Sequence, residues 1–133
     1  VTEHLDKLIN EAIALYAHED KMFSQYSNAS EVNITYWANV NSPGSRNTFH
    51  THKEDFFSAI YYLQAEGTGQ LRFVNPANVL GDCNFSAPFA RDTVIVPKDG
   101  DLILWPSWLP HEVETNLSDK ERINLAFNIK LKL

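Results

Sequence analysis

The sequence predicts a mainly β fold: a jelly roll with one N-terminal helix packed outside it. Two observations carry this prediction. A single amphipathic segment occupies residues 2–18, and about eight short strand-like segments follow it, separated by turns that contain Gly or Pro. A length of 133 residues is most simply one domain, 1–133, with the jelly-roll core at about 32–131.

The N-terminal segment has the apolar pattern of a helix that packs on a sheet. Its apolar side chains recur with helical spacing and form one stripe: Leu5, Leu8, Ile9, Ala12, Ile13 and Tyr16. Thr2 is a suitable N-cap, and Glu3 and Asp6 lie in the first turn, where the helix dipole favours acidic groups. We expect this helix to carry no chemistry, with His4 and His18 in solvent.

The strand-like segments differ in the faces that they bury. Residues 32–40 alternate with period two and are followed by turn residues at 41–47, whereas residues 56–64 are almost wholly apolar, as in a central strand buried on both faces. Further strands are predicted at 70–75, 93–97, 101–105, 111–115 and 122–130. The last segment alternates cleanly between an apolar and a more polar face, with Ile123, Leu125, Phe127 and Ile129 on the first and Arg122, Asn124, Ala126 and Asn128 on the second.

Residues 76–92 form the longest irregular stretch. Long loops in compact domains are often functional lids, and a plain connection is an equally good interpretation of this one. Phe85 and Phe89 of this stretch, with Trp105 and Trp108, are candidates for the mouth of a site. Ordinary packing in the core or beneath a lid is the alternative for each of these aromatic side chains.

The composition limits the classes of partner. The net charge is −6, from 11 basic and 17 acidic residues without a basic block, so no nucleic-acid partner is expected. No apolar run approaches the ~20 residues that span a bilayer, so no membrane partner is expected either. The single Cys83 cannot form an internal disulfide, which favours a reducing, cytoplasmic setting. Because the chain begins at Val1, an upstream segment is expected to be missing.

Three of the five histidines form the strongest candidate for a functional site. His50 and His52 are two residues apart, so on a strand both rings leave the same face. His111 begins another strand-like segment, which a closed β fold can bring to the same point. Three converging imidazoles suit Zn, Cu, Fe or Ni, and a two-histidine, one-carboxylate site would indicate oxygen chemistry at iron. Glu54 and Asp55 are the nearby carboxylates.

Arg122 follows His111 across one turn, so it is expected on the neighbouring antiparallel strand. A guanidinium close to an open metal site can hold a carboxylate through two hydrogen bonds. A surface arginine at the start of a strand is the alternative, and spacing alone favours it.

The motifs, taken in order, resemble the 2-oxoglutarate- and Fe(II)-dependent dioxygenases, in particular the prolyl-4-hydroxylase-like branch and its small bacterial and phage relatives. The resemblance runs from about Tyr36 to Asn128. Its pieces are Pro43-Gly44, His50-x-His52, Ile60-Tyr61-Tyr62-Leu63, Gly69-Gln70-Leu71-Arg72-Phe73, Pro76, Gly100 to Ser107, Pro110-His111-Glu112-Val113 and Arg122-Ile123-Asn124.

The resemblance implies a double-stranded β-helix, which is the jelly roll inferred above. It implies that His50 and His111 bind Fe(II), and that Arg122 and Tyr62 hold the distal carboxylate of the cosubstrate 2-oxoglutarate. It also implies cosubstrate contacts from Asn124 and from Asn39 or Asn41. The implied reaction consumes O2, releases succinate and CO2, and hydroxylates a substrate that is either a peptide side chain or a small molecule.

The chain departs from the family pattern at His52, where the family generally has Asp or Glu. We favour His52 as the third ligand, because its spacing keeps it on the correct face. The alternatives are that Glu54 or Asp55 reaches the metal instead, or that metal binding is weak and activity altered. A neutral imidazole in place of a carboxylate leaves the site one unit more positive, which favours anionic ligands.

Two other classes of function fit the same residues. One is a cupin-type metalloenzyme with three histidines that does not use 2-oxoglutarate, which would leave Arg122 unexplained. The other is a β domain that binds a metal without catalysis.

Overall fold

The structure, a computed structural model, describes residues 2–19, 31–77 and 91–132. These residues form one helix and eight strands, in the order α1 (Thr2–Glu19), β1 (Glu31–Asn41), β2 (Asn47–His50), β3 (Phe57–Gln64), β4 (Leu71–Phe73), β5 (Thr93–Ile95), β6 (Leu102–Pro106), β7 (His111–Val113) and β8 (Arg122–Lys132).

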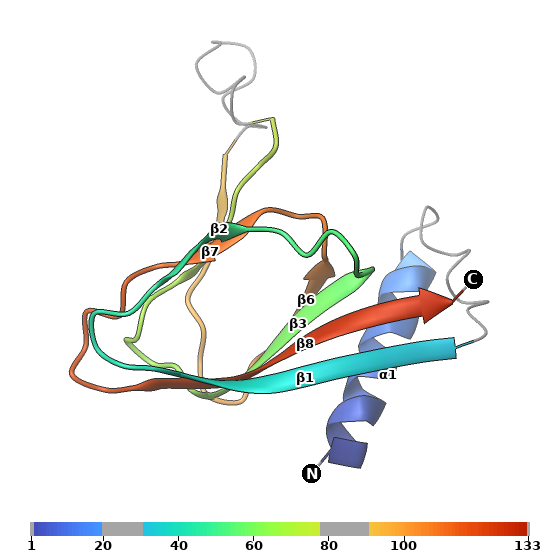
Figure 1. The fold of residues 1–133 in the computed structure, drawn as a ribbon, viewed down its shortest axis with the longest axis horizontal. Helices are drawn as coiled ribbons and strands as arrows, with labels where there is room; N and C mark the ends of the chain where they lie inside the picture. Colours follow the sequence, from blue (N-terminus) through green and yellow to red (C-terminus); the bar gives the residue numbers. More distant parts are fainter. Residues whose placement is uncertain (1, 20–30, 78–90, 133) are drawn as a thin grey trace.

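The strands form two facing sheets of four strands each (Figure 1). The order is β1-β8-β3-β6 in the larger sheet and β2-β7-β4-β5 in the smaller one, and every pairing is antiparallel. Because β1, β2 and β3 pass from one sheet to the other and back, as do β6, β7 and β8, the chain winds as a double-stranded β-helix. The predicted jelly roll with one external helix is confirmed.

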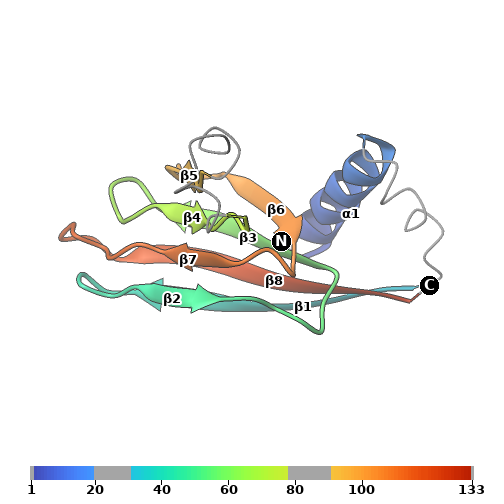
Figure 2. The same cartoon turned by 90° about the horizontal axis from the view of Figure 1, so that it is seen from above.

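Helix α1 packs on the outer face of the larger sheet, beside β3 and β6 in Figure 2. Leu5, Ile9 and Ile13 of the predicted stripe are buried there against Phe127 and Ile129 of β8 and other side chains of the sheet. Burying an aliphatic side chain of this size contributes about 1.5–3 kcal/mol, so this contact holds the helix in place. The side chains of Tyr16 and His18 lie outside the described part, and His4 is exposed as expected.

A second apolar cluster lies between the two sheets. Its buried members are Ile60, Tyr62, Ala65, Leu71, Phe73, Trp105 and Val113. Strand β3 contributes to both clusters, since Phe57 and Ala59 face the helix while Ile60 and Tyr62 face the smaller sheet. The prediction that this strand is buried on both faces is therefore confirmed as far as Tyr62, after which Leu63 is exposed.

The strands of the smaller sheet are shorter than the sequence predicts. The predicted segments 70–75, 93–97 and 111–115 shrink to three residues each in β4, β5 and β7. Gly69, with a φ of 106°, and Pro97 lie next to the ends of β4 and β5, and neither continues a ladder well. Strand β2 begins inside the predicted turn at Asn47.

Part of the predicted lid falls outside the described residues. Positions 78–90 of the stretch 76–92, with Cys83, Phe85 and Phe89, belong to this part. Among the described residues, no helix combines the length and the apolar content needed to cross a membrane.

Candidate metal centre

The three candidate histidines meet between the sheets, at the point where β2 ends and β7 begins. His50 and His111 are direct partners in the β2–β7 register, and His52 follows two residues after His50. The ring centroids are 4.3 Å apart for His50 and His111, 5.0 Å for His50 and His52, and 5.3 Å for His52 and His111. One ring nitrogen from each lies within 4.8 Å of the others, which is the spacing of donors around a single ion.

Hydrogen bonds orient two of the three rings. The Nδ1 of His50 lies 2.7 Å from the carbonyl oxygen of Thr48, and the Nδ1 of His111 lies 3.0 Å from that of Leu109. Since a carbonyl only accepts, each neutral ring carries its proton on Nδ1 and its lone pair on Nε2. This is the arrangement in which metal-binding histidines are usually held.

The environment favours the neutral form of His52 and His111. Burial, with smaller contributions from nearby His50 and His52, lowers the pKa of His111 to about 4, although the hydrogen bond to Leu109 opposes the shift. Burial and the neighbouring His50 also lower the pKa of His52, against the attraction of Asp55. A neutral imidazole is the form that binds a metal, so the site is ready for an ion near neutral pH.

Neither alternative carboxylate belongs to the group of converging ligand atoms, which consists of the three histidines. Glu54 is exposed, and the carboxylate of Asp55 lies 4.0 Å from Nζ of Lys130. The backbone fixes His52 instead: its N–H donates to the carbonyl of Ser107 at 3.0 Å, and its carbonyl accepts from the N–H of Asp55 at 3.2 Å.

The larger sheet faces these histidines with four rows of side chains, because directly paired residues share a face. One of the two central rows is apolar and consists of Trp37, Ala126, Ile60 and Ile103. On one side of it lie Asn128, Ser58 and Trp105, and on the other Asn39, Asn124 and Tyr62, followed by Asn41 and Arg122.

A cavity of about 100 Å³ separates the histidines from this wall. The three histidines line it together with residues of both sheets, among them Trp37, Asn39, Asn47, Ser58, Ile60, Trp105, Ala126 and Asn128. No Asp, Glu, Lys or Arg belongs to the described lining. An ion held by the histidines would therefore be the dominant charge in this space.

Arg122 is buried at the far end of this wall, with 1% of its surface exposed. Its Nη1 donates to the carbonyl oxygens of Thr68 at 2.7 Å and Glu114 at 3.4 Å, and its Nη2 donates to Oδ1 of Asn47 at 3.2 Å. All three acceptors are neutral, and within the described ranges no carboxylate forms an ion pair with Arg122. Burial lowers the pKa of this guanidinium, which reflects the cost of a buried charge without a counter-ion.

Gly69 allows this arginine to lie so close to the backbone. A Cβ at position 69 would lie 2.6 Å from the carbonyl oxygen of Glu114 and 3.1 Å from Nη1 of Arg122. The φ of 106° at Gly69 also disfavours any L side chain. The glycine in the sequence motif therefore has a steric role beside Arg122.

Tyr62, Asn39, Asn41 and Asn124 lie near Arg122 at the same end of the larger sheet. Tyr62 is fully buried, and its hydroxyl has no hydrogen-bond partner among the described residues. Burial raises the pKa of Tyr62 to about 12, so the phenol keeps its proton and remains a donor. Asn39 receives a hydrogen bond from Trp37 and donates to Oδ1 of Asn124 at 3.1 Å, while Oδ1 of the neighbouring Asn41 is buried without a partner in the described part.

Some residues of the cavity were missed by sequence reasoning. Asn47 was assigned to a turn, yet it both lines the cavity and contacts Arg122. Ser58 was seen only as a member of an almost wholly apolar strand and Asn128 only as a member of an alternating one, and no local motif marks either residue. Of the two tryptophans proposed for the mouth, Trp105 is buried and lines the cavity, whereas Trp108 is 55% exposed and does not line it.

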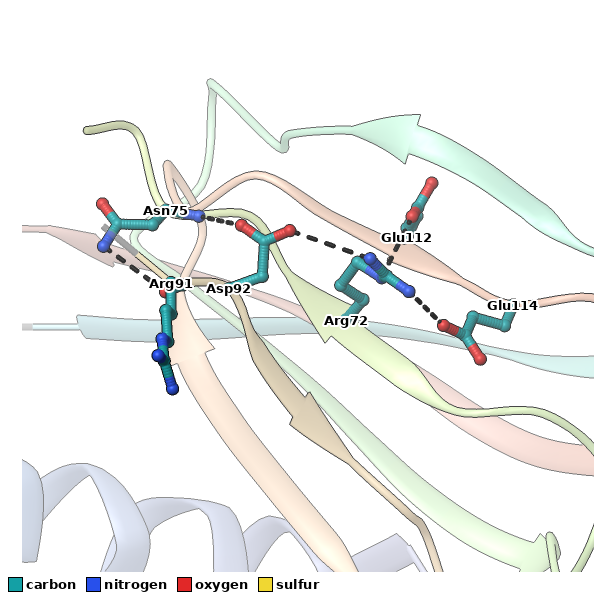
Figure 3. Close-up of polar contacts among 6 residues, drawn as sticks. All are labelled: Arg72, Asn75, Arg91, Asp92, Glu112 and Glu114. Carbon is teal, nitrogen blue, oxygen red and sulfur yellow. Dashed lines mark hydrogen bonds and ion pairs between the residues drawn. The ribbon is translucent and has the colours of Figure 1, made fainter. Parts of the chain in front are cut away.

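A second arginine lies on the opposite face of the smaller sheet (Figure 3). Arg72 of β4 lies between three carboxylates, with nitrogen–oxygen distances of 2.5 Å to Glu114, 3.4 Å to Glu112 and 3.8 Å to Asp92. The hydrogen bond and the charge of Glu114 raise the pKa of Arg72, and its side chain is 37% exposed.

Comparison with known families gives a match over most of the chain. The model of the family described as "Putative 2OG-Fe(II) oxygenase" matches residues 35–128, which include all three histidines and Arg122. No curated protein sequence matches this chain.

Solved structures share the fold. An oxidoreductase of the 2OG-Fe(II) oxygenase family from Burkholderia pseudomallei is 20% identical, with a TM-score of 0.62, and the match covers 77% of this chain and 46% of that one. A Pseudomonas putida prolyl-4-hydroxylase is 20% identical, with a TM-score of 0.57, and the match covers 81% and 57%. The α-ketoglutarate-dependent epimerase SnoN from nogalamycin biosynthesis is 11% identical, with a TM-score of 0.58, and the match covers 74% and 46%. The matched region spans about half the length of these proteins.

Proposed function

The chain belongs to the 2OG-Fe(II) oxygenase family, and from this premise we propose that it is an Fe(II)- and 2-oxoglutarate-dependent oxygenase that hydroxylates its substrate. One observation carries the proposal: a buried arginine without a carboxylate partner among the described residues lies at one end of a wall that faces three converging histidines. The histidines would bind a metal ion, and the arginine would bind the carboxylate of an organic acid.

We assign the metal to His50, His52 and His111. Their donors fit iron in type, since imidazole binds Fe, Zn, Cu and Ni. Among the described residues, the hydrogen bonds of His50 and His111 use Nδ1 and leave the Nε2 lone pairs for a metal. These three protein ligands would leave open positions on the ion for cosubstrate and O2. When bound, the iron with 2-oxoglutarate supplies the oxidising chemistry, in which O2 is consumed, succinate and CO2 are released and one oxygen atom enters a substrate C–H bond.

The distal carboxylate of 2-oxoglutarate is assigned to Arg122 and Tyr62. Two of the five N–H groups of a guanidinium can hold a carboxylate in a planar pair, and the Tyr62 hydroxyl is a buried donor in need of an acceptor. Asn124 accepts from Asn39 through Oδ1, which leaves its Nδ2 as a further donor, and Asn39 acts by orienting Asn124. The apolar central row suits the two methylene groups of the cosubstrate.

The protein's part in the reaction is to bind, orient and shield. Hydrogen bonds from Nδ1 to Thr48 and Leu109 fix two rings before the metal arrives, so little reorganisation is needed. The walls of the second apolar cluster exclude water from the site, which strengthens the electrostatic contacts inside it.

Hydroxylation is the outcome that we propose, with a peptide side chain or a small molecule as substrate. The similarity to a prolyl-4-hydroxylase supports hydroxylation. Because the fold is also similar to that of an epimerase, epimerisation is the alternative outcome to test. A product heavier by one oxygen atom supports hydroxylation, whereas an isomer of the substrate contradicts it.

The experiment begins with metal and cosubstrate binding. We expect the purified protein to bind one Fe(II) and, without O2, to develop a visible absorption band when 2-oxoglutarate is added. With O2, it should convert 2-oxoglutarate slowly to succinate even without substrate. Metal binding without the absorption band would favour the three-histidine metalloenzyme that does not use 2-oxoglutarate. If the protein binds no metal, both the oxygenase and this metalloenzyme are contradicted.

A further inference from the structure

The side of the wall away from Arg122 carries polar groups that the proposed cosubstrate does not use. In this row, Asn128 of β8 pairs with Ser58 of β3, and Ser58 pairs with Trp105 of β6. All three side chains line the cavity beside the histidines. Along β8, Asn128 is six positions from Arg122, which is roughly 20 Å at the rise of a strand. A five-carbon acid held by Arg122 is far too short to span this distance.

Trp105 is the strongest sign of a ligand in this row. It is 6% exposed, and its ring packs edge-on against His111 with centroids 4.9 Å apart. Its Nε1–H is buried, yet it has no acceptor among the described residues. A buried donor without a partner is costly, and a buried indole N–H usually finds an acceptor. Trp105 lines the cavity, and a ligand in the cavity could supply that acceptor.

Asn128 offers a second donor in the same row. The hydroxyl of Ser58 donates to Oδ1 of Asn128 at 3.4 Å, which directs the amide so that its carbonyl side is occupied. None of the hydrogen bonds among the described residues uses the Nδ2 of Asn128. The row therefore presents N–H groups to the cavity, and no acidic side chain lines it to attract a cation.

We propose that Trp105, Ser58 and Asn128 form the subsite for the substrate that is oxidised, and that this substrate presents a carbonyl or carboxylate oxygen to the indole N–H of Trp105. The inference rests on the proposed function for the role of this molecule as substrate. The acceptor-binding subsite itself depends only on the cavity and its donors. Trp105 and Asn128 would bind the acceptor oxygen, and Ser58 would be a positioning residue for Asn128.

The test observes the indole N–H group directly. Protein labelled with 15N and loaded with Zn(II), which is diamagnetic, has indole resonances from Trp37, Trp105 and Trp108. Trp105→Phe identifies the resonance of Trp105 by its loss, and Trp108→Phe is the matched control on an exposed ring. The protein is saturated with 2-oxoglutarate and then titrated with N-methylacetamide, with acetate, or with tetramethylammonium as a probe that has no acceptor.

We expect a saturable downfield shift of the Trp105 indole proton with at least one acceptor probe and no shift with tetramethylammonium. A response to N-methylacetamide alone identifies a carbonyl, such as that of a peptide, and a response to acetate alone identifies a carboxylate. Asn128→Ala should weaken binding of the probe that causes the shift at least about fivefold, and Ser58→Ala should weaken this binding less. Trp108→Phe should leave the response unchanged.

Two results would overturn the inference. If 2-oxoglutarate alone moves the Trp105 resonance and neither probe moves it afterwards, the N–H group serves the cosubstrate. If no addition moves it, the row does not bind an acceptor. Calorimetry of 2-oxoglutarate binding to the same Zn(II) protein tests the proposed function separately. If it detects no binding, the probe titrations without 2-oxoglutarate still decide whether the subsite exists.

Discussion

Two of the four arginines, Arg72 and Arg122, lie on opposite sides of the smaller sheet and in opposite electrostatic environments. Arg72 lies on the outer face, partly in water, among three carboxylates. Arg122 is buried on the inner side, and its hydrogen bonds reach neutral oxygens. Both touch the same residue, since Arg72 pairs with the carboxylate of Glu114 and Arg122 approaches its backbone carbonyl.

The difference shows how charge marks a binding site. In the outer cluster three carboxylates more than offset the charge of Arg72, so this arginine needs no anionic ligand. Exposed ion pairs of this kind contribute little to stability. In the inner region, burial lowers the pKa of His111 and raises the pKa of Tyr62, which favours the neutral form of both side chains. Arg122 keeps one positive charge there without a counter-ion among the described residues. An anion that enters this region meets a charge that the protein has not compensated.

The largest expected effect is that of removing the inner charge. Arg122→Met should raise the Kd for 2-oxoglutarate at least about 100-fold, because losing one partner of a buried, hydrogen-bonded charge pair costs roughly 3 kcal/mol or more. Metal content should stay unchanged, since the three histidines remain. Arg72→Met is the matched control and should bind 2-oxoglutarate normally. Equal losses in both variants would contradict the comparison.

The second prediction concerns pH. The folded pKa of His111 is about 4, below the value of 6.5 in an unfolded chain. Between these values the unfolded chain binds a proton at this ring and the folded chain does not, so the free energy of unfolding of metal-free protein falls as the pH falls from 6.5 to 4. The loss should be about 2–3 kcal/mol, since one pKa unit corresponds to about 1.4 kcal/mol.

Chemical denaturation of wild type and His111→Asn across this window measures the effect. The pH dependence of the free energy of unfolding that remains in His111→Asn comes from other groups. The difference between the two proteins therefore isolates the contribution of the His111 ring. His4→Asn, an exchange on the exposed face of α1, should keep the slope of the wild type. Identical slopes in wild type and His111→Asn would show that burial does not hold this ring neutral.

A third prediction separates binding from stability at Tyr62. Tyr62→Phe should weaken 2-oxoglutarate binding about tenfold, because a hydrogen bond to a charged group contributes roughly 1.5 kcal/mol or more. The ligand-free protein should be at least as stable as the wild type, since the variant removes a buried hydroxyl without a described partner. Tyr61→Phe is the control, because Tyr61 packs toward the helix on the other face of β3. A drop in stability without a change in affinity would assign Tyr62 to the core alone.

The smallest expected effect is on the outer face. Arg72→Met should lower the melting temperature by a few degrees at most, because partly exposed ion pairs are screened by water and salt. The difference from wild type should shrink further at 1 M NaCl, as measured by thermal unfolding at two salt concentrations. A large loss that persists at high salt would show that the outer cluster supports the fold.

The periodicity of the sequence predicted the jelly roll and its helix, but it did not show which face of a strand is inside. In β8 the apolar Phe127 and Ile129 pack beneath α1, while the polar Arg122, Asn124 and Asn128 lie on the opposite face of the strand, where Asn128 lines the cavity. An amphipathic strand shows the same alternation whether its apolar face packs on the opposite sheet or on the helix. The presence of a helix that needs an apolar surface was the signal that could have decided it.

The site was predictable where local spacing was enough and not where it depended on register. His50 and His52 were found from their separation of two, whereas the pairing of His50 with His111 was expected from the resemblance to a family and from the fold. Asn47, Ser58 and Asn128 carry no motif, because their place in the cavity follows from which strands become neighbours. Sequence spacing within one strand does not contain that information.

The pairing of His50 with His111 has a consequence for how the molecule acquires its site. These residues belong to strands far apart in the chain, and their rings meet only when β2 has docked on β7. Contacts of such long range are slow to form, since the intervening chain must first be ordered. Uptake of the ion would therefore report the closure of the smaller sheet, and a nascent chain would acquire metal only after β7 has been made and folded back.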